Sequence, residues 1–158
     1  MITLAIDPST TSTGWCIYNT DTEYAEDYGT IQPKVKDPIK RIMAIRNEIK
    51  ELMRLWKPEL VVIEDLSVTR NAKTTKILAG LQVELEILCV HYNMLYYLVR
   101  PAEWRKVVGI KGRDRKTQKK NAIEYVKRNK LVDTDVSDDE ADALCIGAFA
   151  CNLQIERE

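Results

Sequence analysis

The chain has 158 residues, with 24 basic and 24 acidic side chains, so its formal net charge is zero. This length can bury a core, and we expect a single domain covering residues 1–158. No run approaches the roughly 18 apolar residues that a membrane span needs, and an acidic residue at position 7 interrupts the first apolar run. The sequence therefore predicts no membrane-spanning segment, and we expect a soluble, cytoplasmic protein.

The first 31 residues predict an antiparallel meander of three strands. An apolar run over residues 2–6 ends at Asp7, and residues 15–18 and 24–31 are the other two strands. Ser and Thr fill the turn between the first two. Its backbone N–H groups could face a phosphate, although a hairpin loop alone also explains the composition.

Helices and strands then alternate. Residues 37–56 are apolar at spacings of three and four, which predicts a helix that Pro58 ends. Residues 60–63 are fully apolar, which is typical of a buried strand, and this run ends at Glu64. The next helix, from Thr75 to Tyr92, is apolar on two sides, which favours a place in the core together with a contact to a second subunit.

After a strand over residues 94–99, the charges separate along the chain. Residues 100–128 hold 11 Lys or Arg against 3 acidic residues, whereas residues 133–142 hold 6 acidic residues and no basic one. A basic stretch followed by an acidic one suits a phosphate-binding surface beside a metal site, although most charge runs are solvated helix faces. The last helix begins at Ser137 or Asp138.

Acidic residues at three separate places suggest one shared cation. Asp7 and Glu64 each end an apolar strand, and a third set opens the last helix, where Asp142 shares a face with either Asp138 or Asp139. Oxygen ligands without paired His or Cys suit Mg²⁺ or Mn²⁺, and two such ions could promote phosphodiester cleavage. Each carboxylate also has an ordinary explanation, as a turn residue, an ion-pair partner or a helix cap.

Four short motifs resemble those of the RuvC-type Holliday junction resolvases. They are DPSTTSTG from Asp7, VIE ending at Glu64, DEADAL from Asp139, and VGI from Val108 with KTQ from Lys116. Their order and separations match the family along nearly the whole chain. The compact form resembles the phage-encoded branch, which is associated with cutting branched DNA broadly, and residues 65–68 lack the aromatic residue of the bacterial enzymes.

The resemblance implies an α/β, RNase H-like fold, with a mixed five-stranded sheet of an antiparallel meander plus parallel strands, flanked by helices. It implies a homodimeric, Mg²⁺-dependent endodeoxyribonuclease of DNA recombination and repair. Mn²⁺ would substitute, and two ions would bind in the catalytic complex. Paired nicks would resolve four-way and other branched DNA in a bacterial or phage-infected cell. The resemblance favours Asp139 over Asp138 and assigns four catalytic, metal-binding carboxylates: Asp7, Glu64, Asp139 and Asp142.

Basic residues are expected to bind the DNA. The resemblance implies that Lys116 lies near the scissile phosphate and acts in catalysis, and that Arg70 and Lys73 follow a catalytic strand into a DNA-contacting loop. The basic segment before the acidic helix is the nearest supply of charge for a phosphate. The expected DNA-binding residues are Arg70, Lys73, Lys76, Lys111, Arg113, Arg115 and Lys119.

Two other functions remain open from the sequence. One is a non-catalytic module that binds branched DNA on the same fold. The other is a fragment of an actin-like phosphotransferase, whose first strand also ends in Asp before a Ser/Thr/Gly turn, although such proteins need a second phosphate loop and a second domain.

Overall fold

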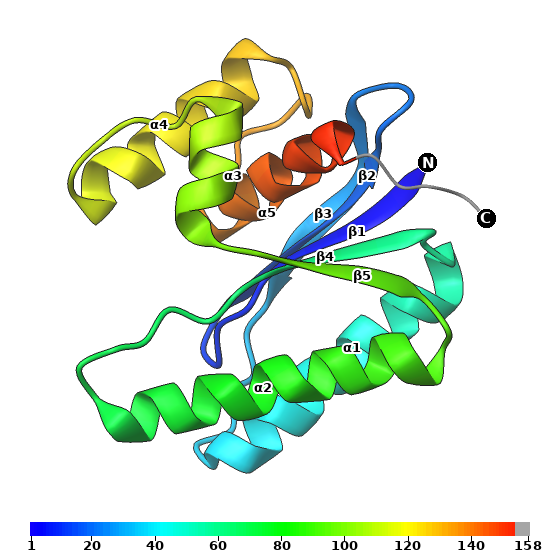
Figure 1. Cartoon of the computed structure of the whole chain (residues 1–158), viewed down its shortest axis with the longest axis vertical. Coiled ribbons are helices and arrows are strands. Elements are labelled where there is room, and N and C mark those ends of the chain that lie inside the picture. Colours follow the sequence, from blue (N-terminus) through cyan, green and yellow to red (C-terminus); the bar gives the residue numbers. More distant parts are fainter. Residues whose placement is uncertain (154–158) are drawn as a thin grey trace.

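A computed structural model describes residues 1–153 of the chain as one mixed sheet between two layers of helices (Figure 1). The sheet has the order β3-β2-β1-β4-β5. Its strands are β1 (Ile2–Asp7), β2 (Thr13–Asn19), β3 (Tyr24–Ile31), β4 (Leu60–Glu64) and β5 (Leu95–Val99). The helices are α1 (Pro38–Trp56), α2 (Ala72–His91), α3 (Pro101–Val108), α4 (Arg115–Arg128), α5 (Asp138–Phe149) and the short 3₁₀ helix η1 (Ala150–Asn152).

The strand pairing brings the acidic carboxyl ends of two neighbouring strands together. β1 runs antiparallel to β2 and parallel to β4, with Ile6 opposite Ile63. β4 is also parallel to β5, and β2 pairs antiparallel with β3. Because parallel neighbours end on the same side, Asp7 and Glu64 leave adjacent strands together.

Each face of the sheet has its own hydrophobic core. Helices α1 and α2 cover one face, where Ile45 and Leu85 are fully buried, and α3, α4 and α5 cover the other, where Trp104 and Leu144 are fully buried. Strand β4 is covered by helices on both faces, which explains why residues 60–63 are all apolar, without alternation.

Helix α5 is buried along almost its whole length against β1 and β2, and its start is set by a capping box. The Ser137 hydroxyl accepts from the Glu140 N–H at 3.3 Å, and the Glu140 carboxylate accepts from the Ser137 N–H at 2.7 Å. Of the two predicted caps, Ser137 is therefore the observed one. This cap fixes which residues of the first turn face the sheet.

The structure confirms the predicted fold and element order and moves two helix boundaries. α2 begins at Ala72 rather than Thr75, because the Asn71 side chain accepts from the N–H groups of Lys73 and Thr74. α4 begins at Arg115, two residues before the basic helix that the sequence predicts over residues 117–129, because Asp114 is its N-cap. Both are polar caps that the apolar periodicity does not register.

Within the described part of the chain, none of the helices combines the length and apolar character that crossing a bilayer requires.

Candidate active site

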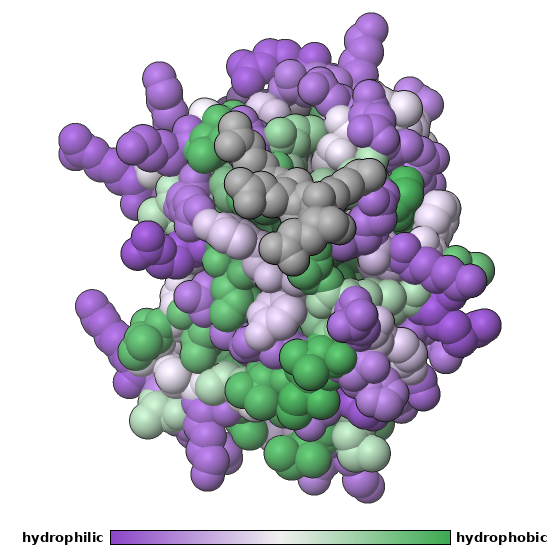
Figure 2. All heavy atoms as spheres, turned by 45° about the vertical axis from the view of Figure 1, so that its right-hand side comes forward, coloured by the Kyte–Doolittle hydropathy of each residue, from purple (hydrophilic) through white to green (hydrophobic). Residues whose placement is uncertain are grey.

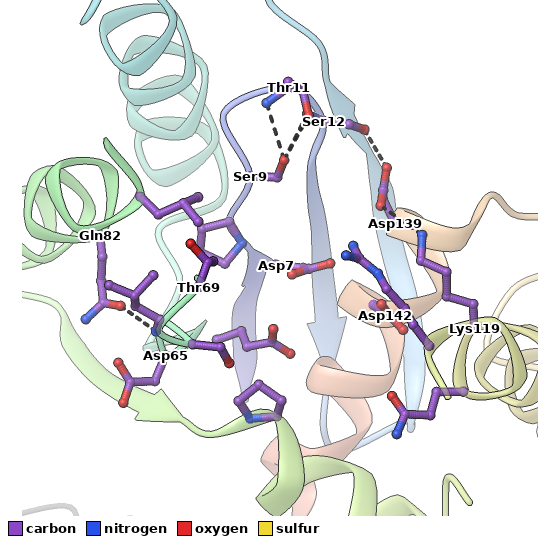
Figure 3. Close-up of a pocket in the computed structure, with 18 of the residues that line it drawn as sticks. Asp7, Ser9, Thr11, Ser12, Asp65, Thr69, Gln82, Lys119, Asp139 and Asp142 are labelled. Carbon is purple, nitrogen blue, oxygen red and sulfur yellow. Dashed lines mark hydrogen bonds and ion pairs between the residues drawn. The ribbon is translucent and has the colours of Figure 1, made fainter. Parts of the chain in front are cut away.

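A cavity of ≈ 610 Å³ opens at the carboxyl ends of β1 and β4 (Figure 3). Four of the acidic residues that line it are those expected from the sequence: Asp7, Glu64, Asp139 and Asp142. Asp65 also lines this carboxylate cavity, but its side chain points away from Asp7. Three elements, β1, β4 and α5, therefore contribute acidic groups to one place.

Gly14 allows α5 to approach β1 closely enough for this. It is opposite Asp7 in the β1–β2 register, and a Cβ atom there would lie 2.1 Å from the backbone oxygen of Asp139. Any side chain would therefore push the first turn of α5 away from the sheet. The glycine that follows the Ser/Thr turn thus controls the distance between two of the carboxylates.

Asp139 lies between a hydroxyl that donates to it and an ammonium group that forms a longer ion pair with it. The Ser12 hydroxyl, on the turn after β1, donates to Asp139 Oδ2 at 2.6 Å, and Figure 3 shows the ammonium of Lys119 on the other side. Lys119 Nζ lies 4.0 Å from Asp139 Oδ1 and 3.0 Å from Asp138 Oδ2. Asp138 is exposed, whereas Asp139 is half-buried and lines the cavity.

Glu64 has a donor on the opposite wall. The indole Nε1 of Trp104, a fully buried residue of α3, donates to Glu64 Oε2 at 2.5 Å. The guanidinium carbon of Arg105 lies 4.9 Å from the centre of the Trp104 ring, which is a cation–π contact. Arg105 itself lines the cavity.

Three of the four carboxylates have perturbed titrations. Burial, and then the charge of Glu64, raise the pKa of Asp142 from 3.8 to about 6. Burial, followed by repulsion from the other three acidic groups, raises the pKa of Asp7 well above its ordinary range. Burial also raises the pKa of Glu64, against the hydrogen bond from Trp104 and the charge of Arg105. The acidic groups therefore disfavour one another's ionised form.

The donor chemistry fits a hard divalent cation, but the side chains are not arranged as a finished ligand shell. The polar side chains around the cavity offer carboxylate, hydroxyl and amide oxygens, which Mg²⁺ and Mn²⁺ prefer. Within residues 1–153, no three acidic, His or Cys side chains are close enough to hold a metal ion. The four carboxylates therefore line one cavity without forming a ligand shell, and Asp139 and Glu64 each accept a hydrogen bond from a neighbouring side chain.

The expected basic residues divide into two groups. Arg115 and Lys119 line the carboxylate cavity. Lys116 is exposed on α4, outside that lining. The remaining expected DNA-binding residues are exposed as well. They lie before α2, in the first turns of α2 and in the loop before α4: Arg70, Lys73, Lys76, Lys111 and Arg113.

Sequence reasoning missed three side chains of this site: Ser12, Trp104 and Arg105. Ser12 is part of the polar turn that was noticed, but nothing in the sequence indicates its contact with a residue 127 positions away. Trp104 and Arg105 could have been found from their position, because they lie in a short helix directly after the last strand, where residues face the strand ends.

Comparison with known proteins agrees with the predicted resemblance. The chain is 29% identical to a crossover junction endodeoxyribonuclease RuvC of Rickettsia akari, over 97% of this chain and 98% of the relative. It is 24% identical to the RuvC of Thermomicrobium roseum, over 99% and 95%. The resemblance to RuvC-type resolvases is therefore confirmed.

The fold is supported independently. The structure of T. thermophilus RuvC in complex with a Holliday junction substrate superposes with a TM-score of 0.78 and 15% identity, covering 94% of this chain and 92% of that chain. At that identity the likeness establishes the fold, which is the RNase H-like one expected. Residues 1–152 match the family described as "Lactococcus phage M3 protein", and the chain belongs to that family.

Proposed function

We propose that the chain is a metal-dependent endonuclease that resolves Holliday junctions and other branched DNA by paired nicks. The observation that carries the proposal is the cavity at the carboxyl ends of β1 and β4, lined by Asp7, Glu64, Asp139 and Asp142. The full-length similarity to proteins named crossover junction endodeoxyribonucleases supports the substrate class. We propose that the chain works as a single nuclease domain, in a bacterial or phage-infected cell, where such DNA is found.

The four carboxylates would hold the divalent cations, Mg²⁺ with Mn²⁺ as a substitute. When bound, a pair of such ions supplies an activated water and stabilises the leaving oxygen of the phosphodiester. Burial, followed by the charge of Glu64, raises the pKa of Asp142 to about 6, so the clustered acidic groups are costly to ionise without a cation. Cation binding would relieve the repulsion between these groups. Asp139 would turn from Ser12, whereas Glu64 could keep the hydrogen bond from Trp104 on Oε2 and offer its other oxygen to the cation.

Positive charge around the cavity would draw in the DNA backbone. Of the basic residues expected from the sequence, Arg115 and Lys119 are already in the lining beside the carboxylates. We assign Lys116 to the scissile phosphate as the family resemblance implies, which requires the exposed side chain to swing toward the cavity when DNA binds. Exposed basic side chains on both flanks would contact phosphates farther away: Arg70, Lys73, Lys76, Lys111 and Arg113.

Paired nicks need two sites, and α2 offers a surface for a two-fold partner. Val83, Ile87 and Val90 are about half exposed or more, at 53%, 49% and 69%, and line a shallow cavity of ≈ 420 Å³. Figure 2 shows apolar side chains gathered on the half of the molecule that holds α1 and α2. We propose that this α2 surface forms the homodimer interface.

A cleavage assay on synthetic DNA tests the proposal. The protein is incubated with a four-way junction and with a linear duplex of the same sequence, with Mg²⁺ or with EDTA. We expect symmetric nicks in the junction only when Mg²⁺ is present, and much slower cutting of the duplex. Tight junction binding without nicks in either Mg²⁺ or Mn²⁺ would favour a non-catalytic binding module.

A further inference from the structure

A second cavity adjoins the carboxylate cavity and has the opposite charge. It has a volume of ≈ 470 Å³ and lies along α3. The two cavities share Ser67, Pro101, Arg105 and Gln118, so they form one continuous surface. The charged side chains that line this α3 cavity are all basic: Arg100, Arg105 and Lys106.

Arg105 stands at the boundary of the two cavities and is held in place there. Its guanidinium stacks on the buried ring of Trp104, and Trp104 in turn donates to Glu64. Within residues 1–153 its Nε atom is buried and has no hydrogen-bond partner. An unpaired N–H on a buried guanidinium nitrogen costs free energy, which a phosphate bound by the same guanidinium would offset.

The N-terminal turn of α3 adds a second attraction for an anion. Pro101 and Ala102, the first two residues of this eight-residue helix, line the α3 cavity. The N-cap residue is Arg100, which makes no side-chain hydrogen bond to the helix amides. The positive end of the helix and the three basic side chains therefore face the same space.

We propose that the α3 cavity is a phosphate subsite, which holds the backbone phosphate of the cut DNA strand next to the scissile one. Arg105 bridges the two phosphates, while Arg100 and Lys106 bind the neighbouring one. Trp104 joins the two sites, since it carries Arg105 on its ring face and Glu64 on its indole N–H. The inference rests on the proposed nuclease function. Arg100, Arg105 and Lys106 lie in the basic stretch of residues 100–128 but are not among the individual residues expected from the sequence to bind DNA.

The test measures binding to junctions with one neutral linkage. Wild-type protein in Mg²⁺ first maps the cut position. Single methylphosphonates then replace each phosphate near the cut, and binding is measured without divalent cations for wild type, Arg100→Ala, Lys106→Ala and Arg105→Gln. Arg54→Ala is the matched control, because Arg54 is exposed in the last turn of α1, which precedes the opposite end of β4.

On unmodified junctions, each variant should bind about tenfold more weakly near 0.1 M salt and lose about one unit of salt slope. On the junction whose neutral linkage replaces the contacted phosphate, wild type and variant should bind equally, since the contact is already absent. That position should lie beside the cut. Arg54→Ala should match wild type on every junction.

Equal losses at all linkage positions would overturn the subsite, because they would indicate diffuse attraction only. Wild-type affinity in both Arg100→Ala and Lys106→Ala would also overturn it, and these exposed positions keep the test valid should Arg105→Gln destabilise α3. Failure of wild type to bind or cut the junction would instead refute the proposed function itself.

Discussion

Glu64 and Asp139 differ in the donors that hold them, and the difference has consequences for metal binding. Asp139 accepts from the hydroxyl of Ser12, a half-buried side chain on the turn after β1 that also accepts from Gln32 Nε2 at 3.3 Å. Glu64 accepts from the indole of Trp104, which is fully buried and cannot rotate without disturbing the core around α3. The position of Glu64 therefore depends on the packing of a buried ring, whereas that of Asp139 depends on a hydroxyl outside the core.

Trp104→Phe should weaken cation binding, because it removes the N–H donor and keeps an aromatic ring against Arg105. We expect about a tenfold loss of Mn²⁺ affinity and a lower single-turnover cleavage rate. Calorimetric titration with Mn²⁺ measures the first effect without relying on activity.

Trp56→Phe is the matched control for this change. The Trp56 Nε1 is also buried, but within residues 1–153 it has no hydrogen-bond partner, so its removal should leave Mn²⁺ affinity unchanged. If both variants bound Mn²⁺ as wild type does, Trp104 would have no positioning role.

The raised pKa of Asp142, about 6 against an ordinary 3.8, predicts how stability depends on pH without divalent cations. Between these two values the folded state holds more protons than the unfolded state, so the free energy of unfolding falls as pH rises from about 4 to 6. Asp142→Asn should remove this loss and stabilise the protein by about 2 kcal/mol at pH 7 in EDTA.

Urea unfolding of both proteins at several pH values, in EDTA and in excess Mg²⁺, measures this effect. Mg²⁺ should restore wild-type stability at pH 7, because it binds only the folded site. A wild-type unfolding free energy that does not change between pH 4 and 7 in EDTA would contradict the account.

At the level of elements, hydrophobic patterns predicted the strands and the long helices α1 and α2, because each buries an apolar face of the matching period. The acidic strand ends were also predictable, since parallel strands such as β1 and β4 must end on one side. The role of α3 was not, because a short helix leaves no periodic signal and its contact with Glu64 depends on tertiary packing. Likewise, only the folded chain distinguishes Arg115, in the cavity, from Lys116, outside it.

Helix α2 has apolar side chains on both its buried and its exposed side. Leu81, Leu85 and Leu88 are buried in the core, while Val83 and Ile87 remain exposed. We expect Ile87→Asp to shift the protein to monomer, because a charge in an apolar interface loses its hydration. Sedimentation at micromolar concentration is the measurement.

Leu55→Asp, on an exposed side chain of α1 that is 69% accessible, is the control and should leave the dimer intact. The variant Ile87→Asp should also nick one strand of a junction at a time, since two coupled sites are needed for paired cuts. A wild-type protein that is monomeric yet still makes paired cuts would exclude the α2 interface.

Over the whole molecule, acidic and basic side chains meet at the carboxyl ends of β1 and β4. The strand ends and α5 bring the carboxylates, and the elements around them bring basic groups: Arg105 and Lys106 from α3, and Arg115 and Lys119 from α4. This division separates affinity from chemistry. Basic residues attract the DNA backbone in any sequence, whereas only the carboxylates can hold the cations needed to cut it.

Asp7→Asn tests that division most directly. Asp7 ends the central strand β1, and its pKa is raised by burial and by the other three carboxylates, so it lies at the centre of the acidic set. The measurement compares junction binding and single-turnover cleavage of wild type and Asp7→Asn, with saturating protein and Mg²⁺. We predict unchanged or slightly tighter binding, because one repulsive charge is removed, and a cleavage rate at least about 1,000-fold lower, equivalent to about 4 kcal/mol of lost transition-state stabilisation. Cleavage by Asp7→Asn at the wild-type rate would contradict the assignment of the active site.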